Sequence, residues 1–154
     1  MVDPASSEPD ARLRATRGPE QSVRLHARSL TLTGLGRASW ASAAEHPSAL
    51  DHLLAALATD LVSGLGEEAR RLGVVLDDIE LRLDAYLENP LVVAGVVGEE
   101  GSPRVRAIRG SLYVGAGCGE AELRELWQRT CARAPVLASL APGLSVDITL
   151  IFVL

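Results

Sequence analysis

The chain has few aromatic side chains, only two cysteines and no cluster of basic residues. Its 154 residues include one Phe, two Tyr and two Trp, so Leu, Val and Ala must fill the core. The formal net charge is −5 and Lys and Arg form no run, which argues against a nucleic-acid partner. No apolar run approaches the roughly 18 residues that a membrane span needs, and the N-terminus lacks the apolar segment of a signal peptide. We expect a soluble cytoplasmic protein.

The sequence shows neither a metal-binding motif nor a phosphate-binding loop. The three histidines lack the spacing of metal ligands. The glycine-containing segment at residues 64–70 lies inside a helical pattern, without the preceding strand that a dinucleotide-binding fingerprint requires. Cys118 and Cys131 could form one disulfide, but two cysteines do not indicate a secreted disulfide scaffold. We expect no metal and no cofactor.

The strongest pattern lies at residues 47–73, where seven leucines recur mostly at spacings of three, four or seven. Such spacing places them on one buried face of a helix. Ser48 is the predicted N-cap, Asp51 takes the role of the capping-box acid, and Gly73 ends the helix. Gly64 weakens the helix by about 1 kcal/mol relative to Ala, and either kinks it or lets another backbone come close.

The remaining patterns predict strands on both sides of this helix and a second helical region. Residues 1–20 are expected to be a disordered tail, which leaves residues 21–154 as the domain. The expected elements are strands at residues 23–28, 79–88, 105–114 and 144–153, a helix at 120–133 and a short helix that begins at Pro135. Apolar residues alternate with polar ones in these strands, and the alternation changes phase near Ser29 and near Ala107. The change near Ser29 indicates either a bulge or a break in the strand. This order indicates an α+β fold with a largely antiparallel sheet.

Two segments carry a further pattern, ALDHLLAALATD at residues 49–60 and RELWQRTCARAPVLASL at residues 124–140. The first resembles the helix start P-x-E-L-L-L-A-A-L-x-x-C of the OsmC/Ohr family of osmotically inducible and organic-hydroperoxide-resistance proteins. The second resembles that family's later helix followed by C-P-V, and the strands at residues 78–87 and at the end of the chain fit as well. The resemblance covers residues 21–154 in the family's order. It implies an intertwined homodimer in which the long helices are buried between curved sheets, with two sites at the dimer interface.

The resemblance also implies a chemistry that this chain does not preserve. In active members a thiolate on the long helix attacks an organic hydroperoxide, a second Cys closes a disulfide, and an Arg and a Glu assist. The matching positions here hold Asp60 and Ala134, and the assisting Glu falls near Leu50, with Asp51 next to it. The candidates for the Arg are Arg24, Arg28 and Arg37, which the sequence does not distinguish. A carboxylate cannot be oxidised and regenerated as a thiolate can, so the family's standard chemistry should be absent.

Each candidate residue has a functional interpretation and a structural one. Asp60 either binds a cationic or hydroxylated ligand or faces solvent, or an Arg across the dimer, from the polar margin of its helix. Cys131 is either a relocated redox thiol or a small buried hydrophobe. Cys118 is either a thiol activated by the helix N-terminus that follows it or a turn residue. Asp51 and His52 are adjacent and do not face each other on a helix, which favours the cap over an acid/base pair.

We therefore expect an OsmC-like pseudoenzyme, a small-molecule binding or interaction protein that works through the pocket at the dimer interface. Its ligand would be small and hydrophobic or peroxide-like. The candidate pocket residues are Asp60, Asp51, Trp127, Cys131 and Ala134. The rival interpretation is a thiol-dependent organic hydroperoxide reductase of the peroxide stress defence, acting through Cys118 or Cys131. A dimer with a purely structural role is a third possibility.

Overall fold

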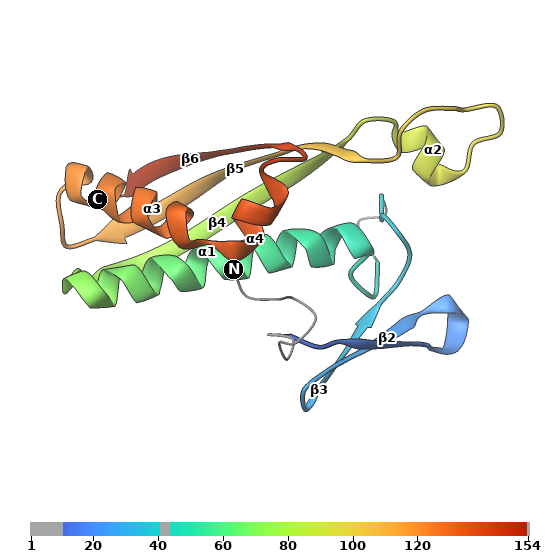
Figure 1. Ribbon diagram of the computed structural model, residues 1–154, viewed down its shortest axis with the longest axis horizontal. Coiled ribbons are helices and arrows are strands. Elements are labelled where there is room, and N and C mark those ends of the chain that lie inside the picture. The colour runs from blue at the N-terminus through green and yellow to red at the C-terminus, as the bar shows by residue number, and fades with distance from the viewer. Residues whose placement is uncertain (1–10, 41–43, 154) are drawn as a thin grey trace, which may run out of the picture. The chain divides into compact units, whose positions relative to one another are not determined.

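The computed structural model describes residues 11–40 and 44–153, and the chain divides into two compact units between His52 and Leu53. The N-terminal unit contains an antiparallel sheet of three strands in the order β1-β2-β3 (Figure 1). The strands are β1 (Arg14–Arg17), β2 (Val23–Ala27) and β3 (Leu30–Gly34), and a 3₁₀ turn, η1 (Pro19–Gln21), precedes β2. Ala27 pairs with Leu30, so only Arg28 and Ser29 form the turn between β2 and β3.

This hairpin explains the change of phase near Ser29. The change is a break between two strands, not a bulge within one. Arg28 takes a left-handed backbone conformation with φ 55°, which is uncommon for a residue with a side chain. Strand β1 and the turn η1 occupy part of the segment that we expected to be a tail, whereas residues 1–10 lie outside the described residues. The domain boundary at residue 21 stays a prediction.

Helix α1 (Ala49–Leu72) has the predicted limits and the predicted cap. The Ser48 N–H and hydroxyl both donate to Asp51 Oδ2 at 2.7 Å, and the Asp51 N–H donates to Ser48 Oγ at 3.3 Å. These reciprocal bonds confirm the capping box. The Ser48 bonds lower the pKa of the Asp51 carboxyl. Gly73 follows α1 with φ 71°, as expected for a residue that ends a helix.

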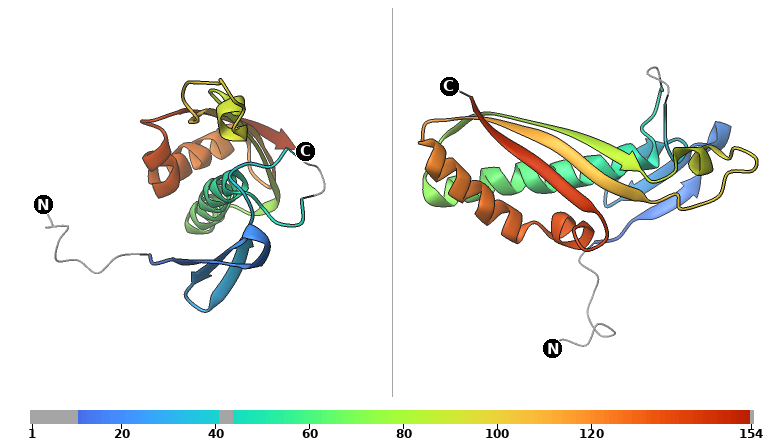
Figure 2. Two further views of the ribbon diagram at one scale, coloured as in Figure 1. Left: turned by 90° about the vertical axis from the view of Figure 1, so that its right-hand side faces the viewer. Right: turned by 90° about the horizontal axis from the view of Figure 1, so that it is seen from above.

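The C-terminal unit is a three-stranded mixed sheet covered on one face by helices. Its strands are β4 (Leu76–Leu87), β5 (Val105–Ala116) and β6 (Ser145–Val153), in that order across the sheet. β4 runs antiparallel to β5, whereas β6 runs parallel to it after a crossover through α3 (Glu120–Arg133) and α4 (Pro135–Leu140). Figures 1 and 2 show α1, α3 and α4 on the same face of this sheet. The bounds of α3 and the start of α4 agree with the prediction.

The core lies between this face of the sheet and the helices. Leu65 of α1, Leu112 of β5 and Leu126 of α3 are fully buried in one cluster, and Leu57, Leu61 and Ile108 form a second. By length and apolar composition α1 could cross a membrane, but its buried leucines identify it as the core helix of this unit.

Two local features adjust β4 and β5. Leu87 pairs with Val105 and Tyr86 with Ala107, so Arg106 is an extra residue that produces the predicted change of phase near Ala107. The segment between the two strands contains a short helix, α2 (Pro90–Ala94), where the sequence is apolar and β-branched. The Asn89 side chain accepts the Leu91 N–H at 3.0 Å and caps this helix.

The α+β fold with a long central helix is confirmed, and the homodimer stays a prediction.

Candidate functional site

The C-terminal unit contains a groove of about 520 Å³ between α1 and the α3–α4 junction. Its lining is mostly polar. The lining residues are Thr59, Asp60, Ser63, Gly64, Glu67, Glu68 and Arg71 of α1, with Thr130, Arg133, Ala134 and Pro135.

Asp60 joins α1 to the start of α4. Its Oδ2 accepts the backbone N–H groups of Val136 at 2.9 Å and Leu137 at 3.2 Å. Ala134, which precedes α4, has no side-chain acceptor for these N–H groups, so Asp60 caps α4 from another helix. The carboxylate therefore has partners within its own chain, which neither interpretation from the sequence included. Asp60 and Ala134 both line the groove, so the two positions that the resemblance aligned with the family's cysteines lie in one site.

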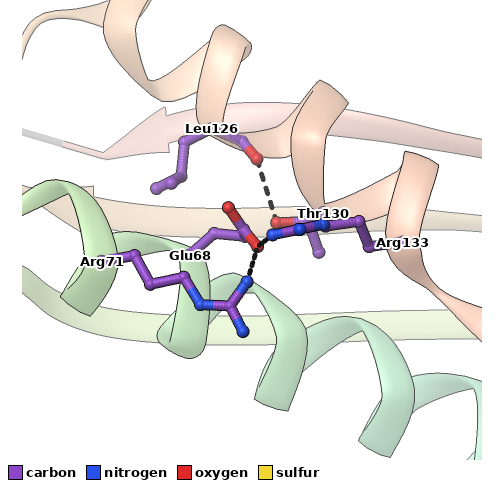
Figure 3. Close-up of polar contacts among 5 residues, drawn as sticks. All are labelled: Glu68, Arg71, Leu126, Thr130 and Arg133. Atoms are coloured by element: carbon purple, nitrogen blue, oxygen red, sulfur yellow. Dashed lines mark hydrogen bonds and ion pairs between the residues drawn. The ribbon is translucent and has the colours of Figure 1, made fainter.

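The other end of the groove holds a buried carboxylate between two arginines, which Figure 3 shows. Glu68 Oε1 accepts Nη1 of Arg71 at 2.9 Å and Nη1 of Arg133 at 2.7 Å. Glu68 is only 6% exposed, and the hydrogen bond from Arg133 lowers the pKa of its carboxyl. We did not single out these three residues from the sequence, because the sequence shows only the pair on α1, at a helical spacing of three.

Gly64 and Thr130 allow the two helices to approach at the groove. A Cβ atom on Gly64 would lie 3.3 Å from Thr130 Cγ2, which is a tight contact. Thr130 is buried, and its hydroxyl donates to the Leu126 carbonyl oxygen at 3.0 Å (Figure 3). The atom that lies close to Gly64 belongs to the Thr130 side chain and not to a backbone, so the approach differs from the one that we expected.

The other predicted pocket residues lie elsewhere. Trp127 and Cys131 are on α3 but pack against the buried leucines, and neither lines the groove. Asp51 belongs to the N-terminal unit and forms the capping box. His52 Nε2 is buried there without a hydrogen-bond partner, while the Asp51 carboxylate accepts hydrogen bonds from Ser48.

The pKa values of both thiols are raised. Burial raises the pKa of the Cys131 thiol to about 11. Burial, and then the negative charge of Glu122, raise the pKa of Cys118, which is opposite to the effect expected from the N-terminus of α3. Both cysteines are free, and neither lines the groove. Within residues 11–40 and 44–153, no three potential metal ligands gather in one place.

The C-terminal unit has a mixed sheet covered on one face by a long helix and a helical crossover, and the N-terminal unit has an antiparallel sheet of its own. Together these elements make the chain an α+β protein. The sequence model of the OsmC-like protein family matches residues 42–149. The chain belongs to the OsmC-like family, which confirms the resemblance found in the sequence.

Solved structures share this fold at low sequence identity. An OsmC-like protein from Mycoplasma pneumoniae gives a TM-score of 0.80 at 16% identity, over 96% of this chain and 100% of that chain. The organic hydroperoxide resistance protein OhrB of Bacillus subtilis gives 0.60 at 14% identity, over 93% and 97%. The organic hydroperoxide resistance protein OsmC from Legionella pneumophila gives 0.65 at 13% identity, over 95% and 99%. A comparison with curated proteins finds no match.

Proposed function

We propose that this chain is an OsmC-like protein that binds a small molecule in the groove and lacks thiol peroxidase activity. The observation that carries the proposal is the pair Asp60 and Ala134, which occupies the cysteine positions of the family and lines a groove without sulfur. The Asp60 carboxylate holds two backbone N–H groups and offers no oxidisable atom. Asp60 and Ala134 would then act as binding or structural residues of the groove.

The state of the cysteines supports the same conclusion. Nucleophilic attack on a hydroperoxide requires a thiolate, and the raised pKa of both thiols disfavours that form at neutral pH. The names of two solved relatives refer to organic hydroperoxide resistance, so hydroperoxide reduction through Cys118 or Cys131 is the outcome that would contradict the proposal. The free cysteines also agree with a reducing compartment, and we propose a cytoplasmic location.

We also propose that the chain forms a homodimer. The exposed hydrophobic side chains of the N-terminal unit support this proposal. Leu30 is 64% exposed, Leu32 is 48% exposed and Trp40 is 62% exposed, and no described hydrophobic side chain of this unit is buried. A sheet usually buries one face against another layer, so a second copy of the chain is the proposed cover.

The first experiment measures consumption of an organic hydroperoxide with a dithiol reductant, for the native chain and for Cys118→Ser and Cys131→Ser. We expect no turnover above the reductant blank. Turnover that either substitution abolishes would overturn the proposal and identify the nucleophile. Native mass spectrometry of the purified chain then measures the mass of the dimer and of any retained small molecule. A bare monomer at micromolar concentration would contradict the homodimer.

A further inference from the structure

Two positive side chains share a single negative partner in the groove. The Nη1 atoms of Arg71 and Arg133 both lie within 2.9 Å of the same oxygen, Glu68 Oε1 (Figure 3). Each guanidinium carries five N–H donors, and each gives one of them to Glu68. The side chains are 52% and 64% exposed, so their other donors remain accessible at the mouth of the groove.

The charges of the three hydrogen-bonded side chains do not balance among themselves. One carboxylate, Glu68, faces two guanidinium groups, so the cluster of Glu68, Arg71 and Arg133 carries one net positive charge. Asp60 is engaged at α4, and Glu67 lines the groove but forms no ion pair with either arginine among the ion pairs of the described residues. The next arginine of α3, Arg129, is paired with Glu125 and is absent from the lining.

We propose that the groove binds a small organic acid whose carboxylate lies between Arg71 and Arg133 and shares the two guanidinium groups with Glu68. This inference rests on the proposed function, because it names the ligand class of the same groove. Arginine matches the planar geometry of a carboxylate, and a monoanion matches the single excess charge. The remainder of the ligand lies over Gly64 and Ala134, beside the hydroxyl of Ser63.

A carboxylate fits this groove better than a phosphate. Asp60 and Glu67 line the same groove, and a phosphate dianion would meet their negative charge after the single excess positive charge was neutralised. The proposed ligand therefore carries one negative charge at the arginine end and a neutral body toward Asp60.

The test uses phenylacetate, its neutral isostere phenylacetamide, and inorganic phosphate, each titrated into the full chain and followed by NMR chemical shifts. We expect phenylacetate to bind about tenfold or more tightly than phenylacetamide, because hydrogen bonds to charged groups are stronger than neutral ones. Its affinity should fall as salt is added, because the site is half-exposed. Equal binding of the amide, tighter binding of phosphate, or no binding of phenylacetate would overturn the proposal.

Matched variants distinguish specific binding at the groove from nonspecific attraction to positive charge on the surface. Arg133→Gln should weaken phenylacetate about tenfold or more, and Arg129→Gln, one turn earlier on α3, should leave it within about twofold. Glu68→Gln should strengthen binding, because it removes the carboxylate that competes with the ligand. A purely structural role for Glu68 predicts the opposite result. Equal losses in Arg129→Gln and Arg133→Gln, or weaker binding in Glu68→Gln chains that remain folded by circular dichroism, would overturn the proposal.

The result also separates this inference from the proposed function. A neutral or cationic molecule retained in the groove, together with no phenylacetate binding, would contradict the ligand class but leave a binding protein without peroxidase activity. Thiol-dependent hydroperoxide turnover would contradict the proposed function even if phenylacetate bound at the arginines.

Discussion

The Asp60 carboxylate lies 2.9 Å from the backbone nitrogen of Val136, a residue 76 positions later in the chain. Through this contact the long helix α1 caps the short helix α4. The resemblance to the OsmC/Ohr family aligns Asp60 with the attacking cysteine of active members. In this chain the side chain at that position accepts two backbone N–H groups and contains no sulfur.

Loss of this cap should destabilise the chain. We expect Asp60→Ala to lower the free energy of unfolding by about 1 to 2 kcal/mol, as for other helix caps, and Asp60→Asn to lower it less, because the amide oxygen still accepts hydrogen bonds. Urea denaturation followed by circular dichroism measures both values. An unchanged midpoint in Asp60→Ala would show that the carboxylate does not cap α4 in solution.

A thiol introduced at this position should be acidic. In a chain that carries Cys118→Ser and Cys131→Ser, we expect Asp60→Cys to give a thiol pKa below about 8.5, because the N–H groups of Val136 and Leu137 stabilise the thiolate. Thiolate absorbance in the ultraviolet, followed against pH, measures this value. The comparison is a chain in which Cys131 is the only cysteine, because burial raises the pKa of this thiol to about 11. A pKa above that of a free cysteine would contradict the geometry.

Gly110 and Gly66 should respond to alanine in opposite directions. A Cβ atom on Gly110 would lie 2.3 Å from the Arg82 carbonyl oxygen and 2.6 Å from Leu83 Cδ2, whereas one on Gly66 meets nothing within 4 Å. Gly110→Ala should therefore destabilise the chain by about 1 to 3 kcal/mol through overpacking. Gly66→Ala should stabilise it by about 1 kcal/mol, because Ala is the better helix former. Thermal unfolding measures the transition temperature of each variant. Shifts of both temperatures in the same direction would contradict this packing.

Acid should remove the stabilisation that Glu68 provides. Its pKa is lowered from the usual 4.5, so the folded state favours the carboxylate. The contribution is present above the unfolded pKa and is lost as the pH falls through the folded pKa. We expect the difference in unfolding free energy between the native chain and Glu68→Gln to shrink as the pH falls below about 4.5.

Urea titrations from neutral pH to about pH 3 measure this difference, with Glu80→Gln as the control. The Glu80 side chain is 60% exposed and pairs with an exposed arginine, so its contribution should be small at every pH. A difference for Glu68→Gln that is independent of pH would show that packing, and not charge, accounts for its effect.

The sequence predicted the elements that local signals define. The leucine spacing and the Ser48–Asp51 box determine α1, and charged and apolar residues alternate with a helical period through α3, so both helices have the expected bounds. Helix α2 was not predicted, because its valines are typical of strands and only the Asn89 cap and Gly95 indicate a helix. The turn at Arg28 was ambiguous, because no glycine marks its left-handed conformation.

The groove depended on contacts that a single sequence does not reveal. The family resemblance located Asp60 and Ala134, but not the hydrogen bonds that engage Asp60. Arg133 and Glu68 are 65 positions apart, and nothing local to either residue indicates the other. Trp127 and Cys131 lie near Ala134 in the sequence, but they pack in the core without lining the groove, whereas Ala134 does both.

The parallel pairing of β6 with β5 has a consequence for the order of folding. β4 and β5 pair antiparallel across the segment that contains α2, whereas Val153 pairs with Gly115 only across the whole α3–α4 crossover. Closing the longer loop costs more conformational entropy before any contact compensates it. We expect β4–β5 contacts in the folding transition state and later docking of β6. Leu81→Ala should therefore slow folding, whereas Leu150→Ala should mainly accelerate unfolding, and stopped-flow kinetics showing the reverse would place β6 in the nucleus.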